Sequence, residues 1–165
     1  MNLELIILRQ EDLDMVREIY NYYILNSTSS FFTGPISVDE LKTFIPVGHP
    51  KYQSFVIHHD GKSCGFCYLS QYNKRQAYDR TAEISLYLHP DVTGRGIGKV
   101  VLEKMEGIAI EQGIRILIGY ISAENVHSIS LFEKFGYERC AHFKKVGEKF
   151  GRLLDVYAYE KMIGE

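Results

Sequence analysis

The amino-acid sequence predicts a single α+β domain over residues 1–165, with about seven strands and about four helices. Two patterns support this class most directly. Asp60-Gly61 separates two apolar runs and is a strong signal for a two-residue hairpin. Residues 85–104 combine an alternating strand, a turn at Pro90, a glycine-rich loop and the first turns of a helix. No repeat, linker or low-complexity stretch divides the 165 residues.

In the first half of the chain, the elements follow from hydrophobic period and turn signals. Apolar residues recur at steps of three and four across residues 11–25, which predicts a helix after a first strand at residues 3–8. Ser37 and Glu40 have the spacing of a capping box, so a second helix is expected to begin there and to end near Pro46. The hairpin strands are expected at residues 53–59 and 62–72.

In the second half of the chain, glycines mark where the predicted helices end. Gly113 ends a long helix, and Gly136 ends a shorter one that opens at residues 123–125. The elements expected here are a strand at 82–88, a helix at 97–112, a strand at 115–122, a helix up to residue 135, and a closing hairpin of strands 137–146 and 152–161 across residues 147–151.

Composition narrows the possible function classes. Apolar residues make up 45% and charged residues 24%, which is ordinary for a globular protein. The net charge of −2 argues against a nucleic-acid-binding surface, which is normally basic. No apolar run reaches the roughly 18 residues that a membrane helix needs, and the N-terminus has no signal-peptide pattern. We therefore expect a cytoplasmic protein without nucleic-acid or membrane partners.

The cysteines and histidines predict neither a disulfide framework nor a metal site. The chain has three cysteines and six histidines, and none has metal-ligand spacing. Cys64 and Cys67 form a C-x-x-C pattern, but they lie within a predicted strand. Residues three apart on a regular strand face opposite ways, so the two sulfurs are not expected to meet.

The glycine-rich loop predicts an anion site. Gly94, Gly96 and Gly98 alternate just before a helix, where free N–H groups and the helix dipole attract phosphates. A Walker A loop needs a glycine where Thr93 stands and a hydroxyl residue after Lys99. A dinucleotide fingerprint needs one more residue before its last glycine. Neither pattern fits, and a loop that only caps the helix remains the alternative.

The loop instead resembles motif A of the GNAT acyltransferases, Gln/Arg-x-x-Gly-x-Gly/Ala, with Thr93 in the first position. Residues 125–137 are similar to motif B of that superfamily. The resemblance implies the GNAT fold, a mixed, mainly antiparallel seven-stranded sheet flanked by about four helices, with splayed central strands that hold acetyl-CoA. It implies cofactor contacts at Leu86, Tyr87, Leu88, Gly94, Arg95, Gly96, Ile97, Gly98, Lys99, Asn125 and Ser128. For Asn125, a simple helix N-cap is the alternative.

A narrower resemblance covers nearly the whole chain. Residues 20–35, 75–90 and 143–161 look like the phosphinothricin N-acetyltransferase group, which includes methionine sulfoximine and methionine sulfone acetyltransferases. This resemblance implies acetylation of the α-amino group of a small amino acid or analogue, by direct attack on the thioester, in a homodimer. It implies that Glu83 is the general base and that Phe31, Arg75, Tyr78 and Arg80 bind the substrate. A solvated strand glutamate and a solvated basic loop are the alternatives for Glu83 and for the arginines.

Three points stay open at this stage. Phe31 and its neighbour Phe32 lie in a polar loop, where they either plug the core or wall a pocket. Phe132 occupies the motif B position where many GNAT enzymes carry a proton-donating Tyr or His. A protein or peptide N-acetyltransferase and a non-catalytic acyl-CoA-binding domain are the competing functions. Glu83 together with residues 75–80, here called the arginine loop, favours an enzyme. The arginine loop and the two phenylalanines favour a small, closed site.

Overall fold

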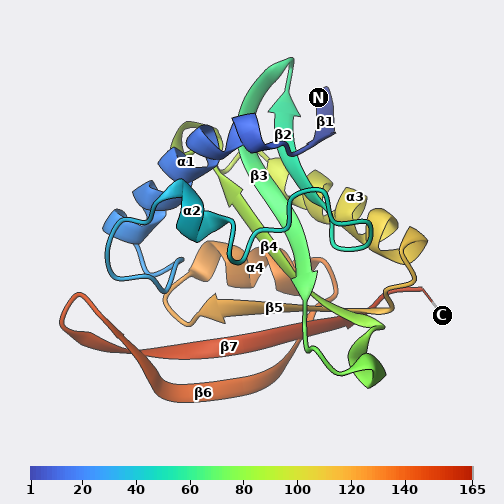
Figure 1. The fold of residues 1–165 in the computed structure, drawn as a ribbon. Coiled ribbons are helices and arrows are strands. Elements are labelled where there is room, and N and C mark those ends of the chain that lie inside the picture. Colours follow the sequence, from blue (N-terminus) through green and yellow to red (C-terminus); the bar gives the residue numbers. More distant parts are fainter. Residues whose placement is uncertain (165) are drawn as a thin grey trace.

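The computed structural model describes residues 1–164 and contains one seven-stranded sheet in the order β1-β2-β3-β4-β5-β7-β6 (Figure 1). All neighbouring strands are antiparallel except β4 and β5, which are parallel. The expected mixed, mainly antiparallel sheet is therefore confirmed. Its strands are β1 (Leu3–Ile7), β2 (Ser54–His59), β3 (Lys62–Gln71), β4 (Thr81–Leu88), β5 (Ile116–Ser122), β6 (Glu138–Lys149) and β7 (Arg152–Met162).

Helices cover both faces of this sheet (Figure 1). They are α1 (Leu13–Asn26), α2 (Val38–Leu41), α3 (Ile97–Glu111) and α4 (Val126–Lys134). One core cluster joins α1 and α2 to the sheet, and a second joins α3 and α4 to it. Successive side chains of a strand point to opposite faces of the sheet, so each strand contributes to both clusters. Phe66 of β3 belongs to the first cluster, and Cys67 belongs to the second. No helix among residues 1–164 is long and apolar enough to cross a membrane.

The second helix is shorter than the sequence predicts. The capping box is confirmed, because the Ser37 hydroxyl accepts from the Glu40 N–H at 3.2 Å and the Glu40 carboxylate accepts from the Ser37 N–H at 3.3 Å. The helix nevertheless ends at Leu41 and turns follow it. The Thr43 hydroxyl donates to the Glu40 carbonyl at 2.6 Å, a side-chain bond that competes with continued helix.

The closing hairpin is longer than predicted. Residues 147–149 were expected in a loop, but they pair with residues 152–154, so the turn contains only Phe150 and Gly151. Both turn residues have positive φ, 55° and 72°, which suits a two-residue hairpin. The prediction began the loop at Gly147, but this glycine lies within β6. It follows a break in register after Phe143, where Lys145 takes a φ of 53°.

The expectation that Cys64 and Cys67 face opposite ways is wrong. The register of β2 and β3 shifts between Ile57 and His58, which inserts an extra residue into β3. Such a bulge reverses the facing of the residues beyond it, and both cysteines lie in the same core cluster. Both are buried free thiols. Residues 1–164 contain no group of three or more His, Cys, Asp or Glu side chains placed to hold a metal.

Candidate active site

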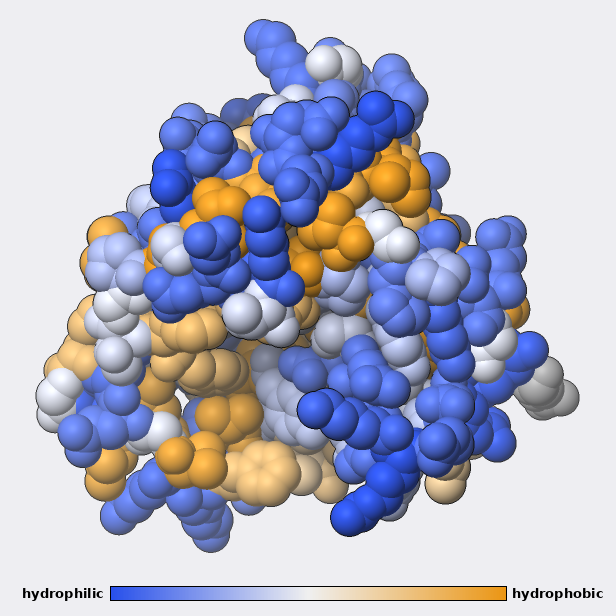
Figure 2. Space-filling view, in the orientation of Figure 1, coloured by the Kyte–Doolittle hydropathy of each residue, from blue (hydrophilic) through white to orange (hydrophobic). Residues whose placement is uncertain are grey.

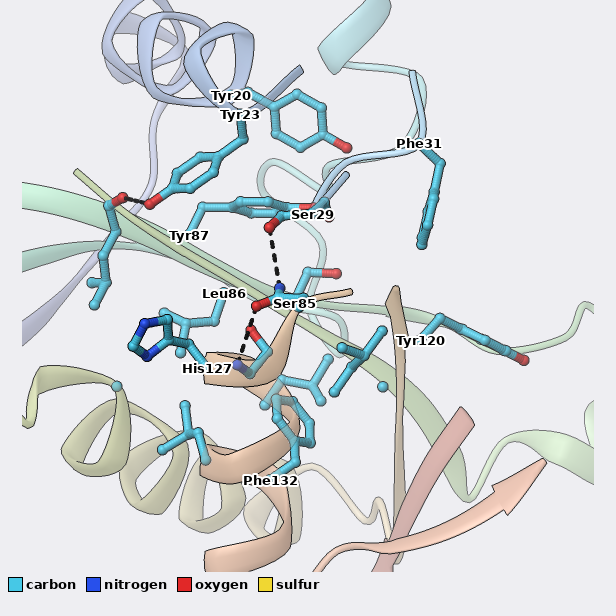
Figure 3. Close-up of a pocket in the computed structure, with 18 of the residues that line it drawn as sticks. Tyr20, Tyr23, Ser29, Phe31, Ser85, Leu86, Tyr87, Tyr120, His127 and Phe132 are labelled. Atoms are coloured by element: carbon cyan, nitrogen blue, oxygen red, sulfur yellow. Dashed lines mark hydrogen bonds between the residues drawn. The ribbon is translucent and has the colours of Figure 1, made fainter. Parts of the chain in front are cut away.

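The site begins where β4 and β5 separate. The two strands pair only from Thr81 to Glu83, opposite residues 116–118, whereas β4 stays paired with β3 as far as Leu88. Beyond Glu83, β4 therefore has no strand partner on its β5 side. A cavity of about 1240 Å³ occupies this gap. Its wall is built from α1, the loop after α1, β3, β4, β5, the glycine loop, α4 and the β6–β7 hairpin (Figure 3).

One end of the cavity is formed by the glycine loop. Gly94 and Gly96 have φ of 76° and 80°, backbone angles that residues with a Cβ adopt only with strain. Helix α3 begins directly after them, at Ile97. Open space surrounds the position where a Cβ of Gly96 would lie. This end therefore offers a helix N-terminus with an uncrowded approach, which suits an anion.

The other residues predicted for this loop have different roles. A Cβ on Gly98 would lie 3.0 Å from the Leu131 side chain, so this glycine allows α3 to pack closely on α4. Ile97 is a core residue, 1% exposed, and only its backbone can face a ligand. The Lys99 side chain lines the cavity, whereas the exposed Arg95 side chain does not.

The free edge of β4 carries the next three predicted residues. Leu86, Tyr87 and Leu88 all line the cavity. Tyr87 packs against the rings of Tyr20 and Tyr23, with centroids 5.0 and 5.5 Å away. Burial holds the pKa of Tyr87 well above its ordinary value, so its hydroxyl stays protonated. The Tyr23 hydroxyl donates to the Leu88 carbonyl, which fixes the end of this edge (Figure 3).

Asn125 is the N-cap of α4. Its side-chain oxygen accepts from the Ser128 N–H at 3.2 Å, so Asn125 does cap the helix, and its contact with the cofactor stays a prediction. Its amide group donates to the Ser29 hydroxyl at 3.1 Å. Both halves of the amide are thus engaged within the protein, and Asn125 and Ser128 together line the cavity. Asn125 links α4 to the loop that follows α1 (Figure 3).

Glu83 lines the cavity where β4 and β5 separate, and it belongs to the last residue pair that joins the two strands, opposite Ile118. Its side chain is partly buried, and burial raises the pKa of its carboxyl above the ordinary glutamate value. Ser85 lines the cavity on the same strand face, as alternation predicts. Such a carboxylate can accept a proton and can hold it at a pH where an exposed glutamate would already be ionised.

Aromatic residues share the cavity with Glu83, and the lining includes Tyr20, Phe31, Phe44, Tyr68, Tyr120 and Phe143. Burial and the nearby charge of Glu83 both raise the pKa values of Tyr20, Tyr68 and Tyr120, so these three rings lie close to that carboxylate. Phe31 walls the cavity, whereas Phe32 packs against Tyr20 and Phe44, with centroids 6.0 and 5.4 Å away. The pocket-wall alternative is therefore confirmed for Phe31, whereas Phe32 is 38% exposed and plugs neither core cluster. Figure 3 shows Tyr20, Tyr87 and Phe31 on one side of the cavity and Phe132 on the other.

The arginine loop is not brought into the cavity wall. Arg75, Tyr78 and Arg80 lie in the connection from β3 to β4 and are exposed, and the cavity lining does not include them. Tyr78 meets Tyr72 edge-on, with ring centroids 5.8 Å apart. A role for these three residues in substrate binding stays a prediction.

Some cavity residues have no signal in the sequence. Phe143 and Val146 reach the cavity from the irregular stretch of β6, and Tyr68 reaches it from β3. Nothing local marks these residues as site residues. Phe132 was noted in the sequence and does line the cavity; a Cβ on Gly119 would lie 2.7 Å from its ring. The ring packs directly on β5 and has no proton to donate.

Comparison with known proteins places this chain in a family. A family model described as an acetyltransferase (GNAT) domain matches residues 5–157. A phosphinothricin N-acetyltransferase of Streptomyces coelicolor is 30% identical, over 92% of this chain and 91% of that protein. An L-methionine sulfoximine/L-methionine sulfone acetyltransferase of Pseudomonas paraeruginosa is 26% identical, over 88% of this chain and 86% of that protein.

Solved structures agree with the sequence comparisons. The crystal structure of a GNAT superfamily phosphinothricin acetyltransferase from Sinorhizobium meliloti, in complex with acetyl-CoA, superposes with a TM-score of 0.91. It is 30% identical in sequence, and the match covers 100% of this chain and 90% of that chain.

Proposed function

This chain belongs to the GNAT acetyltransferase family, and from that membership we propose that it acetylates the α-amino group of a small amino acid or amino-acid analogue. One observation carries the proposal. A single cavity joins an anion cradle at the glycine loop to a partly buried carboxylate, Glu83, along the unpaired edge of β4. This arrangement offers one end to the phosphates of acetyl-CoA and the other to an amine.

The residues of the gap fit acetyl-CoA. Acetyl-CoA supplies an acetyl group that is already activated as a thioester. We infer that backbone N–H groups of residues 94–99 and the Lys99 ammonium hold its pyrophosphate. The pantetheine arm carries amides, which need backbone partners, and the free edge of β4 at Leu86–Leu88 offers them. The uncrowded Gly96 supports the close approach of a phosphate.

Glu83 performs the proton transfer in this proposal. An amine is protonated at neutral pH and attacks a thioester only after it has lost a proton. Glu83 accepts that proton directly or through one water. Burial raises the pKa of Glu83, which makes its carboxylate a better proton acceptor than an exposed glutamate. Phe132 gives no proton to the departing sulfur, so in this proposal water supplies that proton.

A substrate panel tests the proposed acceptor. Acetyl-CoA consumption should be measured with free amino acids, with phosphinothricin, methionine sulfoximine and methionine sulfone, and with short peptides. We expect at least one free amino acid or analogue to give a kcat/KM about 10²-fold above any peptide, since a cavity lined by several aromatic side chains suits a small acceptor. Peptides that are preferred to every free amino acid would replace this function with protein N-acetylation.

The panel can also locate the group that binds the substrate carboxylate. Each accepted amino acid should be compared with its carboxamide, and Arg75→Gln and Arg80→Gln should be measured beside the wild type. An Arg fork binds a carboxylate through two charge-assisted hydrogen bonds. If either arginine binds it, that variant should lose the preference for the acid over the amide. A preference that survives in both variants would place the carboxylate elsewhere.

We further propose a homodimer, with the C-terminal strands as one contact surface. Phe143, Val146, Phe150 and Leu153 of the β6–β7 hairpin are between 43% and 61% exposed. Figure 2 shows apolar side chains gathered over this hairpin, at the lower edge of the view. Exposed apolar patches of this kind often mark protein interfaces. Light scattering at micromolar concentration should give twice the chain mass; a monomeric mass would contradict the proposal.

A further inference from the structure

Lys149, the last residue of β6, is buried without a carboxylate partner. Its side chain is 4% exposed, and it takes part in no ion pair within residues 1–164. Its ammonium donates to two backbone carbonyls, those of Ser27 at 2.8 Å and Ser30 at 2.7 Å. Burial also lowers the pKa of Lys149. Lysine is rarely buried unpaired, because removing its charge from water is costly.

The segment that Lys149 holds, residues 27–31, bridges the gap between β4 and β5. The Ser29 carbonyl accepts from the Tyr87 hydroxyl of β4 at 3.2 Å, and the Ser29 hydroxyl accepts from the Asn125 amide of α4 at 3.1 Å. Figure 3 shows Ser29 above the cavity, joined to the α4 side by a hydrogen bond. Ser29 and Asn125 also line a second cavity of about 470 Å³. The segment thus forms part of the wall between the two cavities.

The two halves of this segment are anchored differently. In the first half, the Thr28 hydroxyl lies 2.9 Å from the Ser122 hydroxyl of β5 and donates to Glu124 at 3.2 Å. In the second half, the Ser30 carbonyl is held by Lys149, and the buried Ser30 hydroxyl has no hydrogen-bond partner within the described residues. Loss of Lys149 would therefore release mainly Ser30 and the adjoining Phe31.

We propose that Lys149 is a positioning residue. By holding the Ser30 carbonyl, it fixes the position of Phe31 in the part of the cavity wall that faces the amine substrate. This inference rests on the proposed function. Lys149 does not itself line either cavity, whereas Phe31 lines the larger one, on the same side of the view as Tyr120, whose pKa burial and the nearby Glu83 charge raise (Figure 3). The buried ammonium of Lys149 thereby fixes the Phe31 side chain, which in this proposal faces the incoming amine. The competing explanation is that Lys149 only stabilises the fold.

The first test is kinetic. Lys149→Met keeps an unbranched apolar side chain of similar length but cannot donate to the two carbonyls. We expect the KM for the amine to rise about tenfold, while the KM for acetyl-CoA changes less than about threefold, because the first half of the segment keeps its own anchors. Equal rises in both KM values, or no rise in the KM for the amine, would overturn the proposal.

A matched control separates positioning from stability. Lys161→Met removes another partly buried lysine, which pairs with Glu106 at 2.9 Å and lies outside the cavity lining. It should lower the thermal midpoint without changing either KM. In a Phe31→Ala background, Lys149→Met should raise the KM for the amine less than about twofold, because the wall that it positions is already gone. An undiminished effect in that background would contradict action through Phe31.

Hydrogen exchange tests the inference without any acceptor. In Lys149→Met, the backbone amides of Ser30 and Phe31 should exchange at least about tenfold faster, while those of Thr28, β4 and β5 keep their protection. Unchanged exchange in this segment would overturn the proposal whatever the substrate is. Faster exchange in an enzyme that acetylates no amino acid would leave the positioning role standing and would refute the proposed function.

Discussion

Replacing Glu83 with Gln should lower kcat by about 10²-fold or more at pH 7, the usual loss when a general base is removed. Gln keeps the shape and a hydrogen-bonding group but cannot accept the proton of the amine. Substrate and cofactor KM values should change little. Glu103→Gln makes the same change on an exposed face of α3 and should behave as the wild type. A near-normal kcat would remove Glu83 from the mechanism, and a normal kcat with a raised KM would make it a binding residue.

The pH dependence of the same variant provides an independent check. The base must be unprotonated to work, and burial raises the pKa of Glu83. The acid limb of the wild-type kcat/KM profile should therefore lie above the ordinary glutamate range, and activity should fall as the pH drops through it. Glu83→Gln should lack this limb. Its defect should shrink as the pH rises, because more of the amine then arrives already deprotonated.

Replacing Gly96 with Asp should raise the Kd for acetyl-CoA by about 10²-fold, measured by calorimetry. Two effects combine. The carboxylate opposes the phosphates that the glycine loop is proposed to bind, and its side chain enters an approach that is open in the native loop. The φ of 80° at this position also strains any residue with a Cβ.

Two further variants separate charge from backbone strain. Gly96→Asn adds a similar side chain without charge, and Asn tolerates positive φ better than most residues, so it should lose less affinity than Gly96→Asp. Gly107→Asp adds the same charge on an exposed part of α3, where nothing lies within 4 Å of the new Cβ. It should bind acetyl-CoA normally. Wild-type affinity in Gly96→Asp would show that the glycine loop is not the phosphate site.

The sequence alone determined the local elements of this protein. Capping at Ser37, the Asp60-Gly61 turn and the glycine loop before α3 depend on backbone conformations of a few consecutive residues, so each has a short-range signal. Hydrophobic alternation along β4 likewise placed Glu83 and Ser85 on one face before any contact was known. The resemblance of residues 93–98 and 125–137 to motifs A and B then indicated the family, which the family model confirms. Phosphate binding at the glycine loop stays a prediction.

Only the tertiary structure decided how these elements enclose the site. Lys149 meets Ser27 across 122 positions of the chain, and Asn125 meets Ser29 across 96. Neither pair has a spacing that a periodic pattern could reveal. A bulge decided the facing of Cys64, because one inserted residue reverses the side chains beyond it. Phe143 and Val146 reach the cavity from a stretch of β6 where two extra residues interrupt the register with β7. Local signals fix backbone conformation, whereas the register between distant strands fixes which side chains meet.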